Sequence, residues 1–197
     1  MKVGFKKASE ERSLALRREL ALSSTAPLPA RVLAQYLGVS VISPEQIRGL
    51  RADDVKQLLE VDNWAWSAVT IQFDLNTLII YNSSHPAGRQ ESDIMHELAH
   101  VLCGHIPAQI GNLLGLDFPL REFPDEQEEE AAWLAGCIQI PRGALLRAVS
   151  QKMSNSEIAQ HYGASEQLVQ FRRNVTGVDR QLLARHRRAE RHQASSI

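Results

Sequence analysis

Residues 94–105 read Ile-Met-His-Glu-Leu-Ala-His-Val-Leu-Cys-Gly-His, and this stretch guides the interpretation of the whole chain. It contains the pattern H-E-x-x-H at His96, Glu97 and His100. Residues four apart project from one face of a helix, so both imidazoles can reach the same metal ion. The glutamate lies one residue off that face, where this motif uses its carboxylate as a general base toward an activated water. The pattern therefore predicts a metal-binding helix that carries its own base.

The surrounding residues predict that this helix is buried and that it ends at Gly104, because glycine commonly terminates helices. Five neighbours of the motif are apolar: Ile94, Leu98, Ala99, Val101 and Leu102. The alternative interpretation is a solvated helix face with accidental histidines. Unpaired polar side chains are costly to bury among apolar residues, and this disfavours the alternative.

The spacing after the motif separates two ways of completing a metal site. A metzincin needs glycine seven residues and histidine ten residues after the first histidine. This chain has Cys103 and Ile106 at those positions. His105 is one residue short, and we interpret it as a helix-end or loop histidine. The remaining route is a His₂Glu set, in which a later helix supplies a carboxylate.

Residues 125–141 predict that later helix. Acidic residues crowd its first turns, where they suit the helix dipole, and an apolar stripe follows before Pro141. Glu128 lies three residues before Ala131 and seven before Ala135, so we expect it to share the face of that stripe and to point into the core as the third ligand. Glu130 is the alternative ligand, because it lies four residues before Leu134.

With these motifs the chain resembles the ImmA/IrrE-type metallopeptidases, a gluzincin-like family. Its members carry H-E-x-x-H and a downstream segment similar to E-x-E-A-x-x-F-A-x-x-L-L-x-P, which matches residues 128–141 here. The resemblance implies that His96, His100 and Glu128 are metal ligands and that Glu97 is the catalytic residue. It also implies a zinc-dependent endopeptidase whose substrate is a regulatory protein such as a helix-turn-helix repressor. Ala132 departs from the pattern, since many members have Asn or Asp there.

Helical patterns dominate the chain and also cover about residues 10–22, 29–37 and 53–60. A short strand is expected at Val41-Ile42. Residues 69–75 alternate between apolar and polar, Asn76-Thr77 reads as a turn, and 78–81 is apolar, which predicts a hairpin. The expected fold is therefore α+β, mostly helical, with a small hairpin or sheet packed beside the metal-binding helix.

The second strand of this hairpin has two interpretations. Exposed strand edges bind extended peptides, so residues 78–82 could pair with a substrate backbone. Alternatively, the hairpin has only a structural role and packs against one side of the core.

The C-terminal region resembles a helix-turn-helix. Ser154 and Glu157 form a capping-box pattern, Gly163 ends a short helix, and a second helix is expected over residues 165–173. Seven arginines against two acidic residues follow between 172 and 191. We predict a metallopeptidase domain over residues 1–150 and a helix-turn-helix-like segment with a basic tail over 151–197. Nucleic-acid binding is an alternative that we do not favour, because a basic patch alone reads no bases.

Composition sets the remaining expectations. A chain of 197 residues with a formal charge of −1 can form one core and gives no global reason to bind nucleic acid or membrane. Cys103 and Cys137 lack C-x-x-C spacing, which suits a reducing cytoplasm. No signal peptide or membrane span is expected. The favoured metal is Zn²⁺, with Mn²⁺ as the alternative, because His and carboxylate ligands accept several divalent ions.

Two points stay open at this level. An oxyanion needs another donor, and four residues are candidates by type alone: Tyr81, His85, Arg89 and Tyr162. The alternative to a peptidase is a DNA-binding or regulatory module with a structural metal site. An open set of three protein ligands would favour the peptidase, because structural zinc is closed by four ligands.

Overall fold

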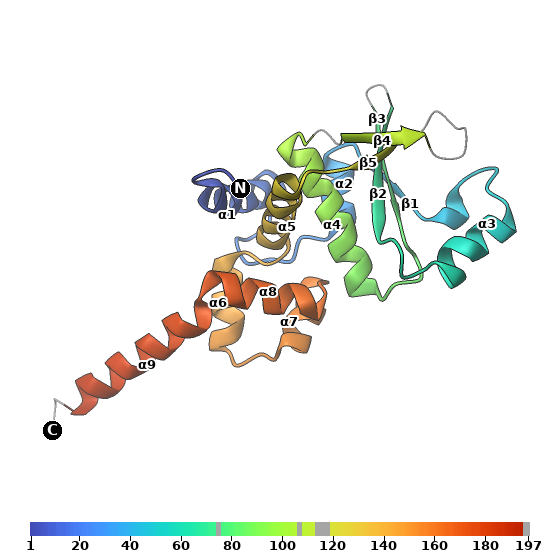
Figure 1. Ribbon diagram of the computed structural model, residues 1–197. Helices are drawn as coiled ribbons and strands as arrows, with labels where there is room; N and C mark the ends of the chain where they lie inside the picture. Colours follow the sequence, from blue (N-terminus) through green and yellow to red (C-terminus); the bar gives the residue numbers. More distant parts are fainter. Residues whose placement is uncertain (74–75, 106–107, 113–118, 195–197) are drawn as a thin grey trace.

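The computed structural model describes residues 1–73, 76–105, 108–112 and 119–194 (Figure 1). Side chains are described within these ranges except at residues 73, 108–112, 119–122, 186 and 189–194. The prediction of a mostly helical α+β fold is confirmed. The elements are α1 (Phe5–Glu19), α2 (Ala30–Tyr36), β1 (Ser40–Ile42), the 3₁₀ turn η1 (Pro44–Gln46), α3 (Ala52–Lys56), the π-helical turn η2 (Gln57–Val61), β2 (Ala68–Phe73), β3 (Asn76–Tyr81), α4 (Ala87–Cys103), β4 (Ala108–Asn112), β5 (Pro119–Glu122), α5 (Asp125–Gln139), α6 (Arg142–Ser150), α7 (Asn155–Tyr162), α8 (Glu166–Thr176) and α9 (Val178–Ala194).

The three-stranded sheet has the order β1-β3-β2. β1 runs parallel to β3, and β2 pairs antiparallel with β3 in a register that places Thr70 opposite Ile79. The expected strand at Val41-Ile42 and the expected hairpin are therefore confirmed. The expected turn at Asn76-Thr77 is wrong, because both residues pair with β2 at the start of β3. The hairpin pairing thus extends two residues further than the sequence pattern suggested.

The idea that residues 78–82 offer an exposed strand edge is also wrong. β3 is the central strand, and its backbone pairs with β1 on one side and with β2 on the other. Among the described strands of this sheet, β2 is the hairpin strand at an edge, and it contacts α4. The sequence pattern identified both strands of the hairpin but not the third strand that covers β3.

The main core lies between α4 and α5. Figure 1 shows these helices side by side, with the sheet beyond α4 and α1 beyond α5. Ile94, Met95 and Leu98 of α4 are completely buried, and they meet the apolar stripe of α5. Gly104 ends α4 in the left-handed conformation with φ 63°, as predicted. This packing places the H-E-x-x-H face of α4 against the acidic start of α5.

The C-terminal helices form a second hydrophobic cluster. It begins at Ile140 and includes buried residues of α6, α7, α8 and the start of α9. The predicted capping box is present, since Ser154 Oγ accepts from Glu157 N at 3.2 Å and Glu157 Oε2 accepts from Ser154 N at 2.7 Å. Beyond the cluster, α9 extends away from the body of the molecule (Figure 1). The division at residue 150 stays a prediction.

Close contacts hold α8 against α5. Arg172 is completely buried and donates to the Ile140 carbonyl at 3.1 Å, to Cys137 Sγ at 3.3 Å and to Glu10 of α1. A Cβ placed at Gly136 would lie 2.8 Å from Arg172 Cδ, so the glycine lets the arginine cross α5 closely. The second helix of the helix-turn-helix-like pair is therefore part of the packed body.

No helix among the described residues is both long and apolar enough to cross a membrane.

Candidate metal centre

Three side chains from two helices converge beside the core. His96 and His100 lie one turn apart on α4, and their Nε2 atoms are 3.1 Å from each other. Glu128 of α5 approaches both, with Oε2 3.0 Å from His96 Nε2 and Oε1 3.5 Å from His100 Nε2. These are the residues that the sequence singled out as ligands. The predicted spacing within the helix and the predicted carboxylate from the later helix thus meet at one place.

The geometry of this cluster fits a small divalent cation. Ligand atoms about 2.0–2.1 Å from a tetrahedral metal lie about 3.3 Å from one another. The three separations of 3.0, 3.1 and 3.5 Å lie close to that value. In addition, two neutral imidazoles with facing Nε2 lone pairs repel one another unless a proton or a cation lies between them. Two imidazoles and one carboxylate are also a ligand set that zinc uses in catalytic sites.

The burial of the two glutamates differs from the expectation. Glu128 does not point into the core: its side chain is 46% exposed, on the open side of the cluster. Glu130 is the buried carboxylate, with 5% of its side chain exposed, and it lies against His105 rather than among the ligands. The face argument failed because α5 is buried on most of its circumference. The backbone of Lys2 and the ring of His105 cover Glu130, while Glu128 stays on the open side.

The electrostatics suit ligation by a neutral imidazole. Burial, followed by the nearby charge of His96, lowers the pKa of His100 to about 3, so this ring stays neutral. Burial also lowers the pKa of His96, but the hydrogen bond to Glu128 and the charge of Glu97 outweigh it and raise the pKa overall. The hydrogen bond from His96 lowers the pKa of Glu128. A carboxylate and a neutral imidazole are thus available to share a cation.

Glu97 lies beside the cluster and is held by the sheet. Its Oε2 accepts a hydrogen bond from Thr70 Oγ1 of β2 at 2.5 Å. Burial raises the pKa of Glu97, while this hydrogen bond and the charge of His96 act in the opposite direction. A carboxylate with a raised pKa is suited to accept a proton near neutral pH. The sequence analysis missed Thr70, because nothing in the alternation of β2 distinguishes it from its neighbours.

A second polar chain supports His100 from behind. Gly104 reverses the backbone, so that His105 N donates to the His100 carbonyl at 3.1 Å and the two Nδ1 atoms lie 3.0 Å apart. His105 Nε2 lies 3.3 Å from Glu130 Oε2. A carboxylate only accepts, so His105 carries its proton on Nε2 and accepts at Nδ1 from His100. His100 Nε2 is then left with a lone pair that faces the cluster.

An aromatic ring completes the pocket of His100. Phe123 stacks on the imidazole, with ring centroids 3.6 Å apart and an angle of 22° between the planes. It lies immediately before α5, so the same connection that delivers Glu128 also covers His100. The sequence analysis did not identify Phe123, because stacking depends on the position of the loop and leaves no local signal.

The two tyrosines considered as oxyanion donors lie away from the cluster. Tyr162 belongs to the C-terminal hydrophobic cluster and donates to the Thr25 carbonyl at 3.2 Å. Tyr81 is the last residue of β3, and the guanidinium of Arg31 lies 4.6 Å from the centre of its ring. These contacts indicate a structural role for both tyrosines.

The other two candidates lie near the start of α4: Arg89 about two turns before His96, and His85 just ahead of the helix. His85 is engaged at both ring nitrogens, by Asp93 Oδ2 at 3.3 Å and by the Asn63 carbonyl at 3.0 Å. Arg89 is 46% exposed, with Nε 3.7 Å from Asp93 Oδ2. Asp93 lies one turn before His96 on α4, so it connects this polar group to the edge of the centre. Of the four candidates, Arg89 is the one with an exposed cationic head on the same helix.

The comparison with protein families places this geometry in a known group. The family model described as the IrrE N-terminal-like domain, Peptidase_M78, matches residues 34–174. Comparisons with curated proteins and with solved structures gave no match. The matched range runs from within α2 into α8 and includes all residues of the centre. It covers well over half of the chain, and this chain therefore belongs to the IrrE N-terminal-like family, a family of metallopeptidase-type domains.

Proposed function

We propose that this chain is a zinc-dependent metallo-endopeptidase that cleaves a regulatory protein, such as a helix-turn-helix repressor, in the cytoplasm. The observation that carries the proposal is the convergence of His96, His100 and Glu128, with one ligand atom of each within 4.8 Å of the others. Glu97, which follows the first histidine, lies beside them. Family membership supports the reaction class, and the resemblance noted in the sequence suggests the substrate class.

The residues have distinct roles in this proposal. His96, His100 and Glu128 would hold the metal. When bound, a zinc ion supplies Lewis-acid chemistry that acidifies a water and polarises the scissile carbonyl. Glu97 accepts the proton from the attacking water and is positioned for this by the hydroxyl of Thr70. The buried chain from Glu130 through His105 keeps His100 in the tautomer that presents Nε2 to the cluster.

The edge of β2 is the place where an extended substrate would bind. Thr70 links this strand to Glu97, so the edge of β2 that pairs with no other described strand runs beside the proposed base. Peptides commonly add to exposed strand edges. Single prolines at Val69, Ile71 and Gln72 test this, because only one alternate set of amides faces the edge; Thr70 is kept, since its hydroxyl holds Glu97. We expect that set to raise KM while metal content is retained, and equal kinetics for both sets in folded variants would reject the arrangement.

Replacement of Glu97 by Gln tests the reaction itself. The amide keeps the hydrogen-bond acceptor for Thr70 but cannot take a proton at neutral pH. We expect metal content equal to that of the wild type and no cleavage of a candidate repressor. Cleavage at the wild-type rate by E97Q would reject the mechanism. Metal analysis after purification, followed by reconstitution with Zn²⁺ or Mn²⁺, tests the metal assignment.

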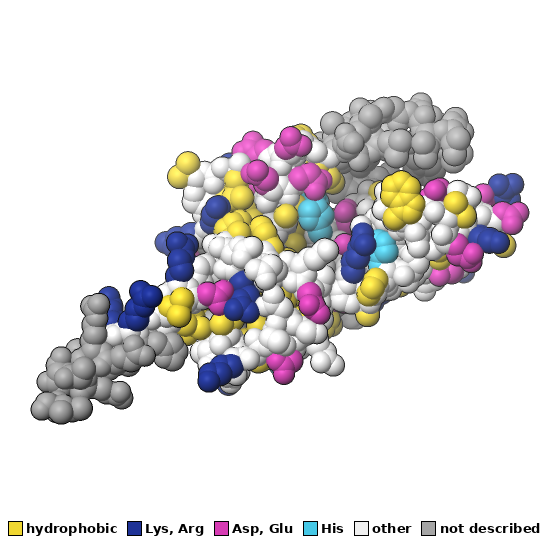
Figure 2. Space-filling model, turned by 60° about the horizontal axis from the view of Figure 1, so that its bottom comes forward, with side chains coloured by type: hydrophobic (Ala, Val, Ile, Leu, Met, Phe, Trp, Pro, Cys, Tyr) yellow, Lys and Arg dark blue, Asp and Glu magenta, His cyan; other side chains and the backbone are white. Residues whose placement is uncertain are grey.

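A DNA-binding or regulatory module with a structural metal site is the second candidate. It is favoured by the arginines of α9, some of which Figure 2 shows on the C-terminal arm. Two observations favour the peptidase. Among the described residues the metal cluster contains three ligands and no cysteine, whereas structural zinc sites are closed and usually rich in Cys. In addition, the inner face of α8 is packed against α5. A salt-dependent gel shift without cleavage would favour the second candidate.

A further inference from the structure

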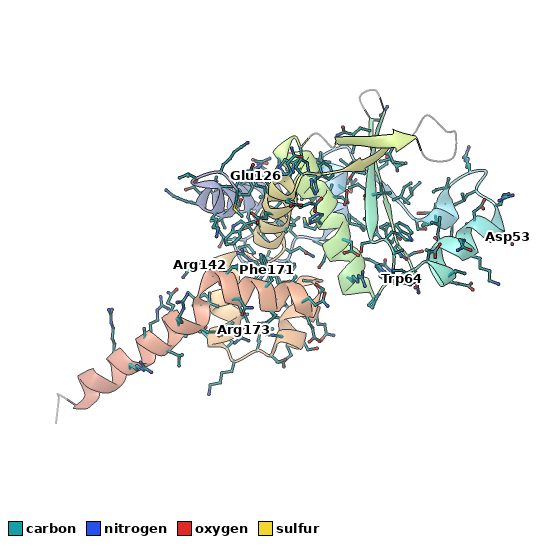
Figure 3. All side chains as sticks on the ribbon, viewed as in Figure 1. Asp53, Trp64, Glu126, Arg142, Phe171 and Arg173 are labelled. Atoms are coloured by element: carbon teal, nitrogen blue, oxygen red, sulfur yellow. The ribbon has the colours of Figure 1, made fainter. Side chains whose placement is uncertain are left out.

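A cavity of about 270 Å³ lies immediately beside the metal centre, and His96 is one of its lining residues. Three helices enclose it. α5 contributes the small side chains of Ala132 and Ala135, which leave the space open. α8 contributes Leu168 and Phe171 as walls. Figure 3 shows Phe171 at the junction of α8 with α5, where its ring meets Trp133 edge-on at 6.1 Å.

The chemistry of the lining favours an uncharged, apolar occupant. The polar groups of α4 at its margin already have partners: Asp93 pairs with His85 at 3.3 Å and with Arg89 at 3.7 Å. Ser92 Oγ accepts from the backbone N–H of Ser165 at 3.0 Å. The side chains of α5 and α8 named above offer carbon atoms. Gln139 of α5 also lines the cavity, and its buried Oε1 has no hydrogen-bond partner among the described residues, so it can accept from an N–H of the occupant. A charged side chain would still be desolvated there without a free group of opposite charge.

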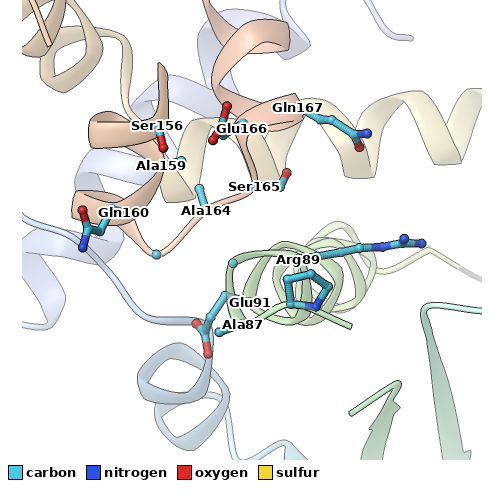
Figure 4. Close-up of a pocket in the computed structure, with 13 residues that line it drawn as sticks. Ala87, Arg89, Glu91, Ser156, Ala159, Gln160, Ala164, Ser165, Glu166 and Gln167 are labelled. Carbon is cyan, nitrogen blue, oxygen red and sulfur yellow. The ribbon is translucent and has the colours of Figure 1, made fainter. Parts of the chain in front are cut away.

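A larger cavity lies next to this one. A space of about 600 Å³ lies between the start of α4 and the turn from α7 to α8, and it shares Ser165 and Gln167 with the smaller cavity. Figure 4 shows Arg89 of α4 and Gln167 of α8 extending in the same direction from opposite walls. The two cavities are thus neighbours along α4 and the start of α8. A peptide chain that leaves the centre on this side has space to continue.

We propose that the cavity beside His96 receives an apolar side chain of the substrate next to the scissile bond, and that α8 thereby determines the cleavage sequence. This inference rests on the proposed peptidase function for its reaction, and it assigns the helix-turn-helix-like pair a role in substrate selection. The position of α8 is well defined for that role, because Arg172 and Gly136 hold it to α5.

The first experiment measures binding to the metal-free protein and so does not depend on catalysis. Alanine and leucine methyl resonances are followed while N-acetyl-leucinamide or N-acetylglycinamide is added. We expect saturable shifts at Ala132, Ala135 and Leu168 with the leucine amide only. Ala132→Leu, which fills the cavity, should abolish them. Equal shifts with both amides, or shifts that A132L does not reduce, would overturn the proposal.

The second experiment reads cleavage preference. A defined peptide pool is digested by the zinc-loaded protein, and cut positions are determined by mass spectrometry. The wild type should prefer medium-sized apolar residues at one position beside the cut. L168A should shift the preference toward Phe and A132L toward Gly and Ala, by about tenfold or more, since one methylene in a pocket changes selectivity by about 10- to 200-fold.

The matched control is Ala8→Leu, which adds the same bulk on the exposed face of α1, outside the cavity. It should retain both the binding of N-acetyl-leucinamide and the wild-type preference. Metal content and thermal unfolding of each variant verify an intact fold, and L168A still tests the pocket if A132L does not fold. Amide binding without any cleavage would refute the peptidase function and support the pocket. Cleavage with no preference at that position would support the peptidase and refute the pocket.

Discussion

Single residues decide how His100 presents its nitrogen. The ring is 2% exposed, Phe123 covers one face, and Nδ1 is occupied by His105. Because the hydrogen bond at Nδ1 fixes the tautomer of this buried imidazole, its Nε2 lone pair can bind a metal ion without rearrangement of the ring. Groups that do not touch the metal but hydrogen-bond to a ligand histidine commonly fix its tautomer and orientation, and they strengthen metal binding. His105 and Glu130 are therefore positioning residues in this centre.

Replacement of His105 by Ala or of Glu130 by Gln should weaken metal binding about 10- to 100-fold, the usual cost of losing such an outer partner. The reason is that H105A removes the acceptor that fixes the Nδ1 proton of His100, while E130Q replaces the charged acceptor of His105 Nε2 by a weaker, neutral one. Competition with a chromophoric chelator measures the affinity. His161→Ala, an exposed histidine of α7, is the control and should bind metal like the wild type. Unchanged affinity in both H105A and E130Q would contradict the role.

The hydroxyl of Thr70 should matter for turnover and not for metal binding. Thr70→Val keeps the shape of the side chain but removes the donor to Glu97. A hydrogen bond to a charged group contributes about 1.5–3 kcal/mol, so we expect kcat/KM to fall about 10- to 100-fold with metal content unchanged. Thr70→Ser should restore most of the activity. Wild-type kinetics in T70V would show that Glu97 needs no support from β2.

At the scale of elements, two helices and one strand build the centre. α4 supplies three of the four central residues, His96, Glu97 and His100, because they lie within one turn of this helix and beside its buried apolar face. α5 supplies the fourth because it packs alongside α4. β2 fixes Glu97, and α8 closes the adjacent cavity. Close backbone approaches at two glycines keep these elements in position.

Gly88 at the start of α4 makes one of these approaches. A Cβ there would lie 2.5 Å from the Ala164 carbonyl oxygen, in the turn between α7 and α8. Gly88→Ala should lower the free energy of unfolding by about 1–3 kcal/mol, because overpacking against backbone outweighs the gain in helix propensity.

Gly143 of α6 is the matched control for this substitution. Its Cβ would meet no atom within 4 Å, so Gly143→Ala should raise the free energy of unfolding by about 0.4–1 kcal/mol. Urea unfolding of both variants measures the two effects. A stabilised G88A would mean that α4 and the turn before α8 are not in close contact.

At the scale of the whole molecule, the part of the chain that the structure describes forms two hydrophobic clusters, and neither includes the proposed metal ligands. Removal of the metal with a chelator should therefore leave the helical circular dichroism intact and only lower the melting temperature. A ligand present at 100 times its Kd stabilises the native state by about 2.7 kcal/mol, which sets the scale of the change. Loss of helical signal on chelation would instead indicate a structural metal and favour the second candidate function.

The sequence by itself determined the local features. H-E-x-x-H defines its own geometry, because residues four apart in a helix always share a face. Gly104, the capping box at Ser154 and the alternation in β2 are likewise local, and the structure confirms the helix ends and the strands they predict. The sequence also predicted Glu128 as the third ligand; the structure places it beside His96 and His100, but on the open side and not in the core.

Only the tertiary structure decided the remaining features, because they depend on distances between segments far apart in the chain. The pairing of β1 with β3 makes β2 the edge strand and brings Thr70 to Glu97. Contacts with Lys2 and His105 bury Glu130, whereas Glu128 remains at the open side. The docking of α8 creates the cavity beside His96. Periodicity shows which face of an element is apolar, but which neighbour covers that face follows from the global arrangement of the chain.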